Sequence, residues 1–230
     1  MCGRFTLTED LKALAKQFDV PLPPPFASYA PRFNIAPTQM VIVVTEAGKR
    51  QIVQMRWGLI PSWAKDPSIG NRIINARAET LAAKPAFRIA LRKRRCLIPA
   101  DGFYEWQKLG NTKQPVRIVL RSRKPFGFAG LWDTWTSPQG EVIQSCTIIT
   151  TESNELLKGV HDRMPVILTS EAQKLWLDPK IMEPSVLLPL LKPYPSSEMQ
   201  YYAVSTMVNS PGNDRAECVV PVASSATQNL

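Results

Sequence analysis

The chain has 230 residues, of which 44% are hydrophobic and 20% charged, a composition typical of a soluble globular protein with a sizeable core. Its 28 Lys and Arg residues outnumber 19 Asp and Glu residues, and the net charge of +9 favours a polyanionic partner such as nucleic acid. No apolar run approaches the roughly 20 residues of a membrane span. One histidine excludes a histidine-rich metal site, and four widely spaced cysteines exclude a zinc ribbon or a disulfide framework.

The start of the chain carries charges at Arg4, Glu9 and Asp10, where a secretory signal would need an apolar stretch. We therefore expect a cytoplasmic protein. Thr6 and Glu9 have the spacing of a capping box, and the apolar residues that follow recur at helical spacing, which predicts a helix over about residues 9–18. The prolines of residues 21–25 predict an extended connection.

Apolar and β-branched runs along the rest of the chain predict strands. They cover Met40–Thr45, Gln51–Trp57, Cys96–Pro99, Val116–Leu120, Phe126–Leu131, Cys146–Thr150, Pro165–Leu168 and Tyr201–Ser205. Helices are expected at Ala76–Ala83, Ala86–Lys93, Asn154–Val160, Ser170–Leu177 and Pro184–Leu191. Many strands with interspersed helices and no regular βαβ alternation indicate an α+β fold in one domain, residues 1–222. The small polar residues 223–230 are expected to be disordered.

Cys2 is the most informative residue, because the initiator methionine is commonly removed before a small side chain. Removal would place an α-amine and a thiol on one residue, both partly deprotonated near neutral pH. Such a 1,2-aminothiol condenses with an aldehyde through its amine and then closes a thiazolidine ring through its thiol. The alternative is a cysteine that merely follows Met1 in a disordered end of the chain. Cys96 and Cys146 lie in apolar runs and are expected to be core thiols.

Asn75 follows the apolar pair Ile73 and Ile74, at an expected corner between a strand and a helix. Two interpretations of Asn75 are open. As the cap of that helix it would be structural, whereas the helix N-terminus with Arg77 in its first turn would also suit a phosphate.

Glu105 lies in an aromatic run that continues from the Cys96–Pro99 strand. Strand alternation places it on one face with Phe103, and places Tyr104 and Trp106 on the other. A carboxylate beside an aromatic ring is partly desolvated, which raises its pKa and suits it to acid–base chemistry. The alternative is a surface glutamate on an edge strand.

His161 is flanked by Asp162 and Arg163 in a short loop, the kind of segment in which catalytic residues concentrate. A structural hydrogen-bonding role is its alternative.

Aromatic and basic residues are also interleaved along the chain. Such residues can form a groove that holds single strands by base stacking; the alternative is that the aromatics belong to the core. They are Phe5, Trp57, Trp63, Tyr104 and Trp106, with Arg4, Arg56, Lys65 and Arg72. The basic run Arg92–Arg95 is expected to be a solvated helix end.

Taken together, six motifs over about residues 1–210 resemble the SRAP family, the SOS-response-associated peptidases or abasic-site processing proteins. The motifs are Met1–Phe5, Asn34–Pro37, Arg56–Pro61, Ile74–Thr80, Pro99–Trp106 and His161–Pro165. The resemblance implies one α+β domain with antiparallel-rich sheets that curl toward a barrel and with peripheral helices. It also implies a basic cleft that binds single-stranded DNA with an abasic site, where the mature Cys2 crosslinks to the ring-opened sugar aldehyde and shields the lesion from strand cleavage.

The resemblance implies four catalytic residues and four DNA contacts. Cys2 would be the nucleophile, Asn75 would hold the sugar and the Cys2 backbone, and Glu105 would transfer protons. His161 would assist ring closure, its reversal and the autocatalytic removal of Met1. The implied DNA contacts are Arg4, Arg77 and Arg163 for phosphates and Trp106 as a stacking wedge. No metal or other cofactor is implied. We expect lyase-like, self-crosslinking chemistry in a monomer near the nucleoid.

Two other functions remain open at this point. Class II glutamine amidotransferases also begin Met-Cys-Gly, but they typically carry a downstream Asn-Gly-Asp/Glu element, which this chain lacks. A non-covalent single-strand-binding module with an inert Cys2 is the second alternative.

Overall fold

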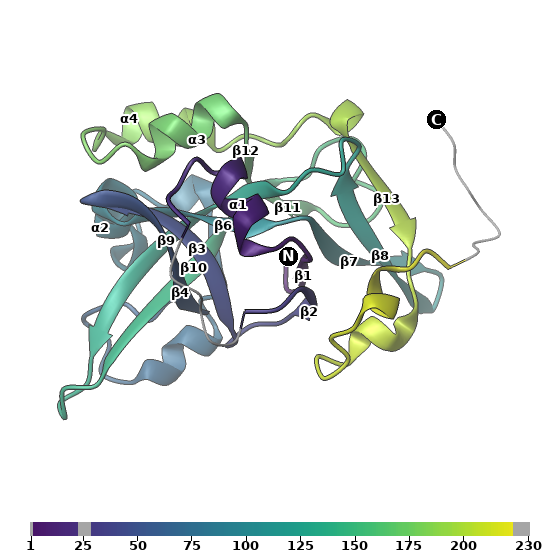
Figure 1. Ribbon diagram of the computed structural model, residues 1–230, viewed down its shortest axis with the longest axis horizontal. Helices are drawn as coiled ribbons and strands as arrows, with labels where there is room; N and C mark the ends of the chain where they lie inside the picture. The colour runs from purple at the N-terminus through teal and green to yellow at the C-terminus, as the bar shows by residue number, and fades with distance from the viewer. Residues whose placement is uncertain (1, 23–28, 223–230) are drawn as a thin grey trace.

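The computed structural model describes residues 2–22 and 29–222, whose strands form two sheets around a shared core (Figure 1). The five-stranded sheet has the order β13 (Met199–Ala203), β8 (Thr112–Leu120), β7 (Gly102–Leu109), β1 (Phe5–Leu7) and β2 (Arg32–Ile35). The eight-stranded sheet has the path β11 (Arg163–Pro165), β10 (Val142–Glu152), β4 (Lys49–Trp57), β3 (Met40–Ala47), β6 (Arg95–Ala100), β9 (Phe126–Thr136) and β12 (Ile167–Leu168), with β5 (Asn75–Arg77) paired to β10.

Five strands of the larger sheet close on themselves. The chain of pairs runs β4–β3–β6–β9–β10, and β10 then pairs with β4, so the sheet curls into a barrel. The β10 pairings with β4 and β5 are parallel, and the other pairs among the described strands are antiparallel. The predicted α+β fold with an antiparallel-rich, barrel-like sheet is confirmed.

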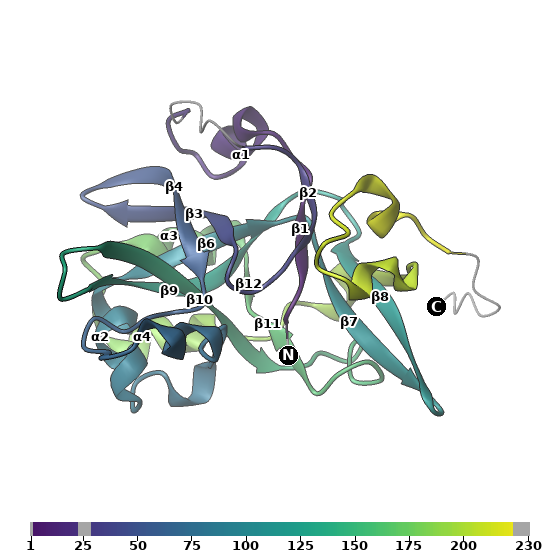
Figure 2. The same ribbon diagram turned by 90° about the horizontal axis from the view of Figure 1, so that it is seen from below.

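Short helices lie outside the sheets (Figures 1 and 2). The α-helices are α1 (Leu11–Gln17), α2 (Pro85–Lys93), α3 (Ser170–Leu177) and α4 (Pro184–Leu187). The 3-10 helices are η1 (Pro67–Asn71), η2 (Ala78–Thr80), η3 (Leu188–Leu190), η4 (Ser196–Glu198), η5 (Thr206–Asn209) and η6 (Ala216–Val219). Helix α3 has the predicted bounds, with Thr169 as its N-cap, and α2 confirms the predicted helix at Ala86–Lys93. None of the described helices is long and apolar enough to cross a membrane.

One apolar cluster joins the two sheets. Phe5 of β1 makes edge-to-face contacts with Trp57 and Phe128, at ring-centroid distances of 5.2 and 5.9 Å. Cys96 and Cys146 are fully buried in the same cluster, as predicted. Strand β1 therefore packs the smaller sheet, to which it belongs, against the barrel, and the beginning of the described chain lies beside β7 and β11 in both views (Figures 1 and 2).

The predicted capping box is wrong. Asp10 is the N-cap of α1, because its side chain accepts a hydrogen bond from the backbone N–H of Ala13. Thr6 belongs instead to β1, where its hydroxyl donates to the carboxylate of Asp101. The Thr6 hydroxyl, which the local pattern predicted to cap the helix, is therefore bonded to the buried Asp101 carboxylate instead.

Two further helix predictions are wrong. Asn75 does not cap a helix at Ala76–Ala83, since it begins β5, which pairs in parallel with β10, and only η2 follows. Residues 154–160 form consecutive turns rather than a helix, although Asn154 does accept a hydrogen bond from Leu157 N at 3.1 Å. In the first segment, pairing with β10 outweighs the local helix propensity.

Arg95 is also not part of a solvated helix end. It is buried at the start of β6, and its guanidinium donates to the carbonyl oxygens of Trp176 and Asp178 at 2.6 Å and to those of Leu91 and Arg92. The side chain thus caps the ends of α2 and α3 together. Most of the predicted proline-rich connection, Met1 and the predicted tail at 223–230 lie outside the described residues.

Candidate active site

Strand β1 brings Cys2 to the inside of the molecule. Phe5 pairs with Phe103 of β7, and Tyr104 N donates to Arg4 O at 3.0 Å, so this register leads the N-terminal residues toward Glu105. The side chain of Cys2 has no exposed surface and belongs to the main apolar cluster. This placement contradicts the interpretation of Cys2 as a residue of a disordered chain end.

Asn75 holds the backbone of Cys2. Its Nδ2 donates to Cys2 O at 2.8 Å, a contact between residues 73 positions apart. Parallel pairing of β5 with β10 fixes Asn75 opposite Ile148 and so orients the side chain toward the N-terminal segment. Its Oδ1 is buried and makes no hydrogen bond to another described residue, so it remains free to accept one.

Glu105 is 4% exposed, which excludes the alternative of a surface glutamate. Burial raises the pKa of its carboxyl, and the nearby His161 opposes this shift. The pKa of the Cys2 thiol is also raised, first by burial and then by the charge of Glu105. Glu105 therefore lies within electrostatic range of both Cys2 and His161, although the three residues come from distant parts of the chain.

His161 follows the turns after β10 and precedes β11. Its Nδ1 accepts a hydrogen bond from Arg163 N at 3.0 Å and lies 2.7 Å from an Asp162 carboxylate oxygen. The backbone hydrogen bond needs a free lone pair on Nδ1, whereas the contact with Asp162 is a hydrogen bond only when Nδ1 carries a proton. The two contacts at this nitrogen are therefore alternatives.

Arg163 is held by acidic and backbone groups of the protein. Its Nη1 and Nη2 form a two-pronged ion pair with Glu79 at 2.7 and 3.0 Å, and Nη2 also donates to Thr150 O at 2.7 Å. This pair holds the pKa of Glu79 below its ordinary value. Arg77, in contrast, is exposed and has no ion pair with another described residue. Of the predicted phosphate contacts Arg77 and Arg163, Arg77 is therefore the one without an ion pair to another described residue.

Arg4, just before β1, and Trp106 of β7 form a second cluster. The Arg4 guanidinium carbon lies 5.9 Å from the centroid of the Trp106 ring. Arg4 Nη1 donates to Asn34 Oδ1 at 2.8 Å and to Val208 O at 2.7 Å. Arg4, a predicted phosphate contact, thus also links the N-terminal segment to η5 by a hydrogen bond.

The other interleaved aromatic and basic residues divide between core and surface. Phe5, Trp57 and Tyr104 are buried, so the core interpretation is correct for them. Trp63 is 58% exposed, and Lys65 and Arg72 near it are exposed as well. Arg56 is committed to the carbonyl of Gly58 and the side chain of Asn71. A stacking surface is therefore restricted to Trp63 and Trp106 among these aromatics.

Sequence reasoning missed Asp101 as a support of the N-terminal strand. Its buried carboxylate accepts hydrogen bonds from the Thr6 hydroxyl, from the Thr8 N–H and hydroxyl, and from Arg117 Nη2 at 2.9 Å. Burial of both Asp101 and Arg117 makes this a low-dielectric ion pair. A motif that alternates apolar and polar residues contains no signal for such a pair, because Asp101 lies between β6 and β7 while Arg117 lies on β8.

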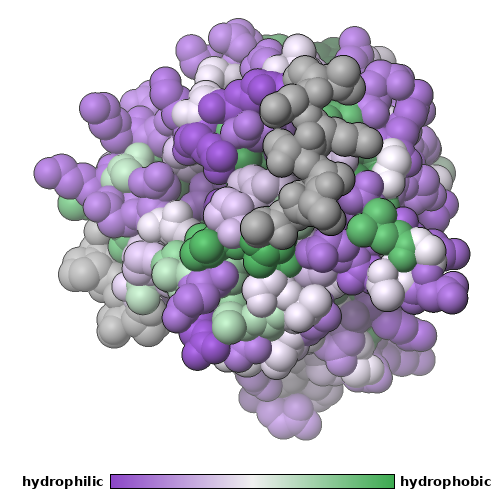
Figure 3. All heavy atoms as spheres, turned by 90° about the vertical axis from the view of Figure 1, so that its right-hand side faces the viewer, coloured by the Kyte–Doolittle hydropathy of each residue, from purple (hydrophilic) through white to green (hydrophobic). Residues whose placement is uncertain are grey.

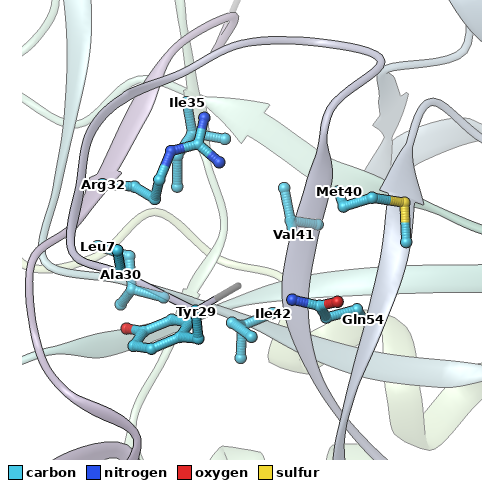
Figure 4. Close-up of a pocket in the computed structure, with 9 residues that line it drawn as sticks. All are labelled: Leu7, Tyr29, Ala30, Arg32, Ile35, Met40, Val41, Ile42 and Gln54. Carbon is cyan, nitrogen blue, oxygen red and sulfur yellow. The ribbon is translucent and has the colours of Figure 1, made fainter. Parts of the chain in front are cut away.

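A recess of about 340 Å³, open solvent included, lies away from these residues (Figure 4). Apolar side chains that include Leu7, Ile35 and Ile42 line it, together with Arg32 and Gln54. None of the predicted catalytic residues lines this recess. The atoms visible on the face that carries β8 and β13 are mostly hydrophilic, with small separate hydrophobic areas (Figure 3). The candidate reaction site is therefore the region of Cys2, Asn75, Glu105 and His161, called the Cys2 region below, rather than this recess or this face.

A family model and several known proteins match this chain. The model of the SOS response associated peptidase (SRAP) family matches residues 1–211. The chain belongs to the SRAP family. The match starts at the N-terminal segment that carries Cys2 and extends through η5, so every residue of the Cys2 region lies within it.

Two curated relatives of this SRAP protein are abasic site processing proteins by name. YoqW of Bacillus subtilis is 48% identical over 95% of this chain and 99% of its own length. HMCES of Gallus gallus is 34% identical over 84% of this chain and 67% of its own length. A crystal structure of a Bacteroides thetaiotaomicron protein superposes with a TM-score of 0.84 at 26% identity, over 96% of this chain and all of that one.

Proposed function

We propose that this SRAP protein processes abasic sites in single-stranded DNA by forming a covalent crosslink through the mature Cys2. The names of its relatives support the abasic substrate. The observation that best supports this chemistry is the 2.8 Å hydrogen bond from Asn75 Nδ2 to the Cys2 carbonyl oxygen, beside the buried Glu105. A chain end that served only as a tether would not need a carboxamide and a carboxyl group from two distant segments beside it.

The reaction begins with the sugar. Glu105 has a raised pKa because it is buried, so it holds a proton at pH values where an exposed glutamate is ionised. It can donate this proton to the ring oxygen while its other carboxyl oxygen accepts the proton of the sugar hydroxyl, which opens the ring to the aldehyde and leaves Glu105 protonated for the next step. Asn75 Oδ1, free of other partners among the described residues, accepts a hydrogen bond from the opened sugar.

The crosslink then forms in two steps. The α-amine of Cys2 attacks the aldehyde carbon, and the carbinolamine loses one water to give an imine, with Glu105 protonating the leaving hydroxyl. The thiol next adds to the imine carbon, and its proton passes to the nitrogen with the help of His161. The net change is one C–N and one C–S bond formed and one water released, with no change of oxidation state.

Closure to the thiazolidine explains why both nucleophiles belong to one residue. An imine is an electron sink, and it would promote β-elimination of the 3′ phosphate and break the strand. Ring closure removes the C=N bond and leaves the strand intact. A buried, neutral thiol suits this second step, because it adds only after the imine has formed within its reach.

The proposal includes removal of Met1, since only then does Cys2 have a free α-amine. Glu105, which lies within electrostatic range of Cys2 and of His161, would provide acid–base catalysis for this single peptide cleavage together with His161. It also includes a monomer acting near the nucleoid, with phosphate contacts from Arg4, Arg77 and Arg163 and stacking by Trp106. Arg77 supplies the freest of these charges.

The experiment is a crosslinking assay on the purified protein. A labelled single-stranded oligonucleotide with one abasic site is incubated with the wild-type protein, C2A and C2S, then denatured by heat and separated on a gel. We expect a heat-stable shifted band with the wild-type protein, and none with C2A. C2S keeps the amine and should form an adduct that appears only after reduction of the imine. A shifted band of equal intensity with C2A would refute the proposal.

A further inference from the structure

Asn209, at the end of η5, contacts both members of the Arg4–Trp106 cluster. Its Oδ1 accepts a hydrogen bond from the Trp106 indole Nε1 at 2.7 Å. Its backbone carbonyl accepts a hydrogen bond from Arg4 Nη2 at 3.2 Å. One exposed residue thus joins the edge of the indole to the guanidinium that lies over the ring.

The segment that carries Asn209 is itself firmly anchored. Val208 is buried against Tyr104 and Val204, in a small apolar cluster on which Trp106 also packs. The side-chain amide of Asn34 donates to the carbonyls of Val208, Ser210 and Asn213. Asn209 therefore presents its carboxamide from a fixed backbone, which is what a residue needs if it is to set the orientation of another side chain.

The position of the indole matters because Trp106 is the neighbour of Glu105 on β7. A half-buried indole can turn about two side-chain dihedral angles, and a hydrogen bond to its N–H together with a guanidinium over its face selects one orientation. The orientation of the ring decides whether a base next to the reacting sugar can stack on it.

We propose that Asn209 is a positioning residue for DNA: its carboxamide oxygen holds the Trp106 indole in the orientation that receives the nucleobase beside the abasic sugar. This inference rests on the proposed function and adds to it a residue outside the catalytic group. Stacking on an aromatic ring tolerates every base, so the effect of Asn209 requires a neighbouring base but does not depend on which one it is.

A double-mutant cycle tests this role. W106F keeps a stacking ring but lacks the indole N–H, and N209A keeps the backbone but lacks the acceptor. We expect each to lower the apparent crosslinking rate constant at subsaturating DNA by about fivefold, the value of one net hydrogen bond, and the double variant to be no worse than the single ones. Additive losses would show that Asn209 acts independently of the indole and would overturn the proposal.

The controls separate this inference from the proposed function. Asn111 is exposed at the turn between β7 and β8, so N111A is the matched control and should match the wild type. On an oligonucleotide whose reacting abasic site is flanked on both sides by tetrahydrofuran analogues, which cannot open to an aldehyde, N209A should lose its defect. A wild-type protein that forms no adduct overturns both proposals. A wild type that crosslinks while N209A behaves like N111A overturns the role of Asn209 alone.

Discussion

Burial determines the protonation of the two groups closest to the proposed chemistry. Cys2 and Glu105 both have raised pKa values, and burial is the first cause for each. A neutral thiol does not react prematurely with other electrophiles, and a carboxyl group with a raised pKa keeps its proton to higher pH and can act as an acid there. The local electrostatics therefore favour the order of events in which the amine reacts first and the thiol closes the ring afterwards.

Glu105 should leave a signature in the pH dependence of stability. Its carboxyl binds a proton more tightly in the folded protein than in the unfolded chain, so folding stability should fall as pH rises from the ordinary value of 4.5 through the raised pKa. E105Q has no such proton to lose. We expect urea denaturation to give a flatter pH dependence for E105Q than for the wild type over this window.

The same variant should slow crosslinking by about 100-fold or more at neutral pH, the scale of general acid–base catalysis. Equal pH dependence of the unfolding free energy in the two proteins would show that Glu105 is not perturbed by burial. An unchanged crosslinking rate would remove it from the mechanism.

At the scale of the elements, β1 is a strand of three residues that positions the reactive end of the chain. So short a strand gains little from its ladder, and the Asp101 carboxylate adds hydrogen bonds to Thr6 and Thr8 on either side of Leu7. Arg117 neutralises the buried charge and also donates to Thr6. The pair therefore fixes β1 at a point four residues from Cys2.

D101N tests this anchoring. The substitution leaves Arg117 buried without its carboxylate, which typically costs about 3 kcal/mol or more. We expect that loss in the free energy of unfolding measured with urea, together with faster hydrogen exchange of the Phe5 and Leu7 amides. E155Q, which removes an exposed ion pair with Lys158, is the control and should change stability far less. Equal losses in the two variants would contradict the anchoring role.

Element prediction succeeded where local pattern and tertiary structure agree. Helix α3 has a threonine cap, an amphipathic interior and a proline beyond its end, and its bounds were predicted without error. The alternation around Glu105 was also correct, because Phe103 packs in the main core while Tyr104 and Trp106 pack in the small cluster. Strands β1, β2 and β5 were missed because three or four residues are too few to show a period. Asn75 was consequently predicted to cap a helix, whereas it begins strand β5.

At the scale of the whole molecule, the excess of positive charge has an expected consequence for DNA binding. Each phosphate neutralised on a single strand releases counterions and contributes about 0.7 to the slope of log affinity against log salt. Arg77 is exposed without an ion pair to another described residue, whereas Glu79 already balances Arg163. The net charge alone indicates nucleic acid, but it does not distinguish these two residues.

R77A should therefore reduce the salt slope by about 0.7, and R163A should reduce it by less. Fluorescence anisotropy with a labelled single strand, across a series of salt concentrations, measures both slopes. K108A, a substitution at an exposed position on β7 outside the predicted contacts, serves as the control. A larger change for R163A than for R77A would mean that DNA displaces Glu79 from Arg163.

Fold and family were predictable from sequence because six motifs in fixed order span nearly the whole chain, and the family match over residues 1–211 confirmed the resemblance. The assembly of the site was less predictable. No local pattern indicated that Arg4 would bind the carbonyls of η5, that Glu79 would hold Arg163, or that Asp101 would anchor β1. Each of these contacts joins residues more than 80 positions apart, so it exists only once the sheets have formed.

The most direct test of the central claim is the intact mass of the crosslinked product. Purified wild-type protein is incubated with a single-stranded oligonucleotide that contains one abasic site, and the adduct is measured by mass spectrometry without reduction. A thiazolidine on the mature chain predicts the mass of the protein lacking Met1 plus the intact oligonucleotide minus one water. An adduct that retains Met1, or one that carries only a cleaved strand, would contradict the account.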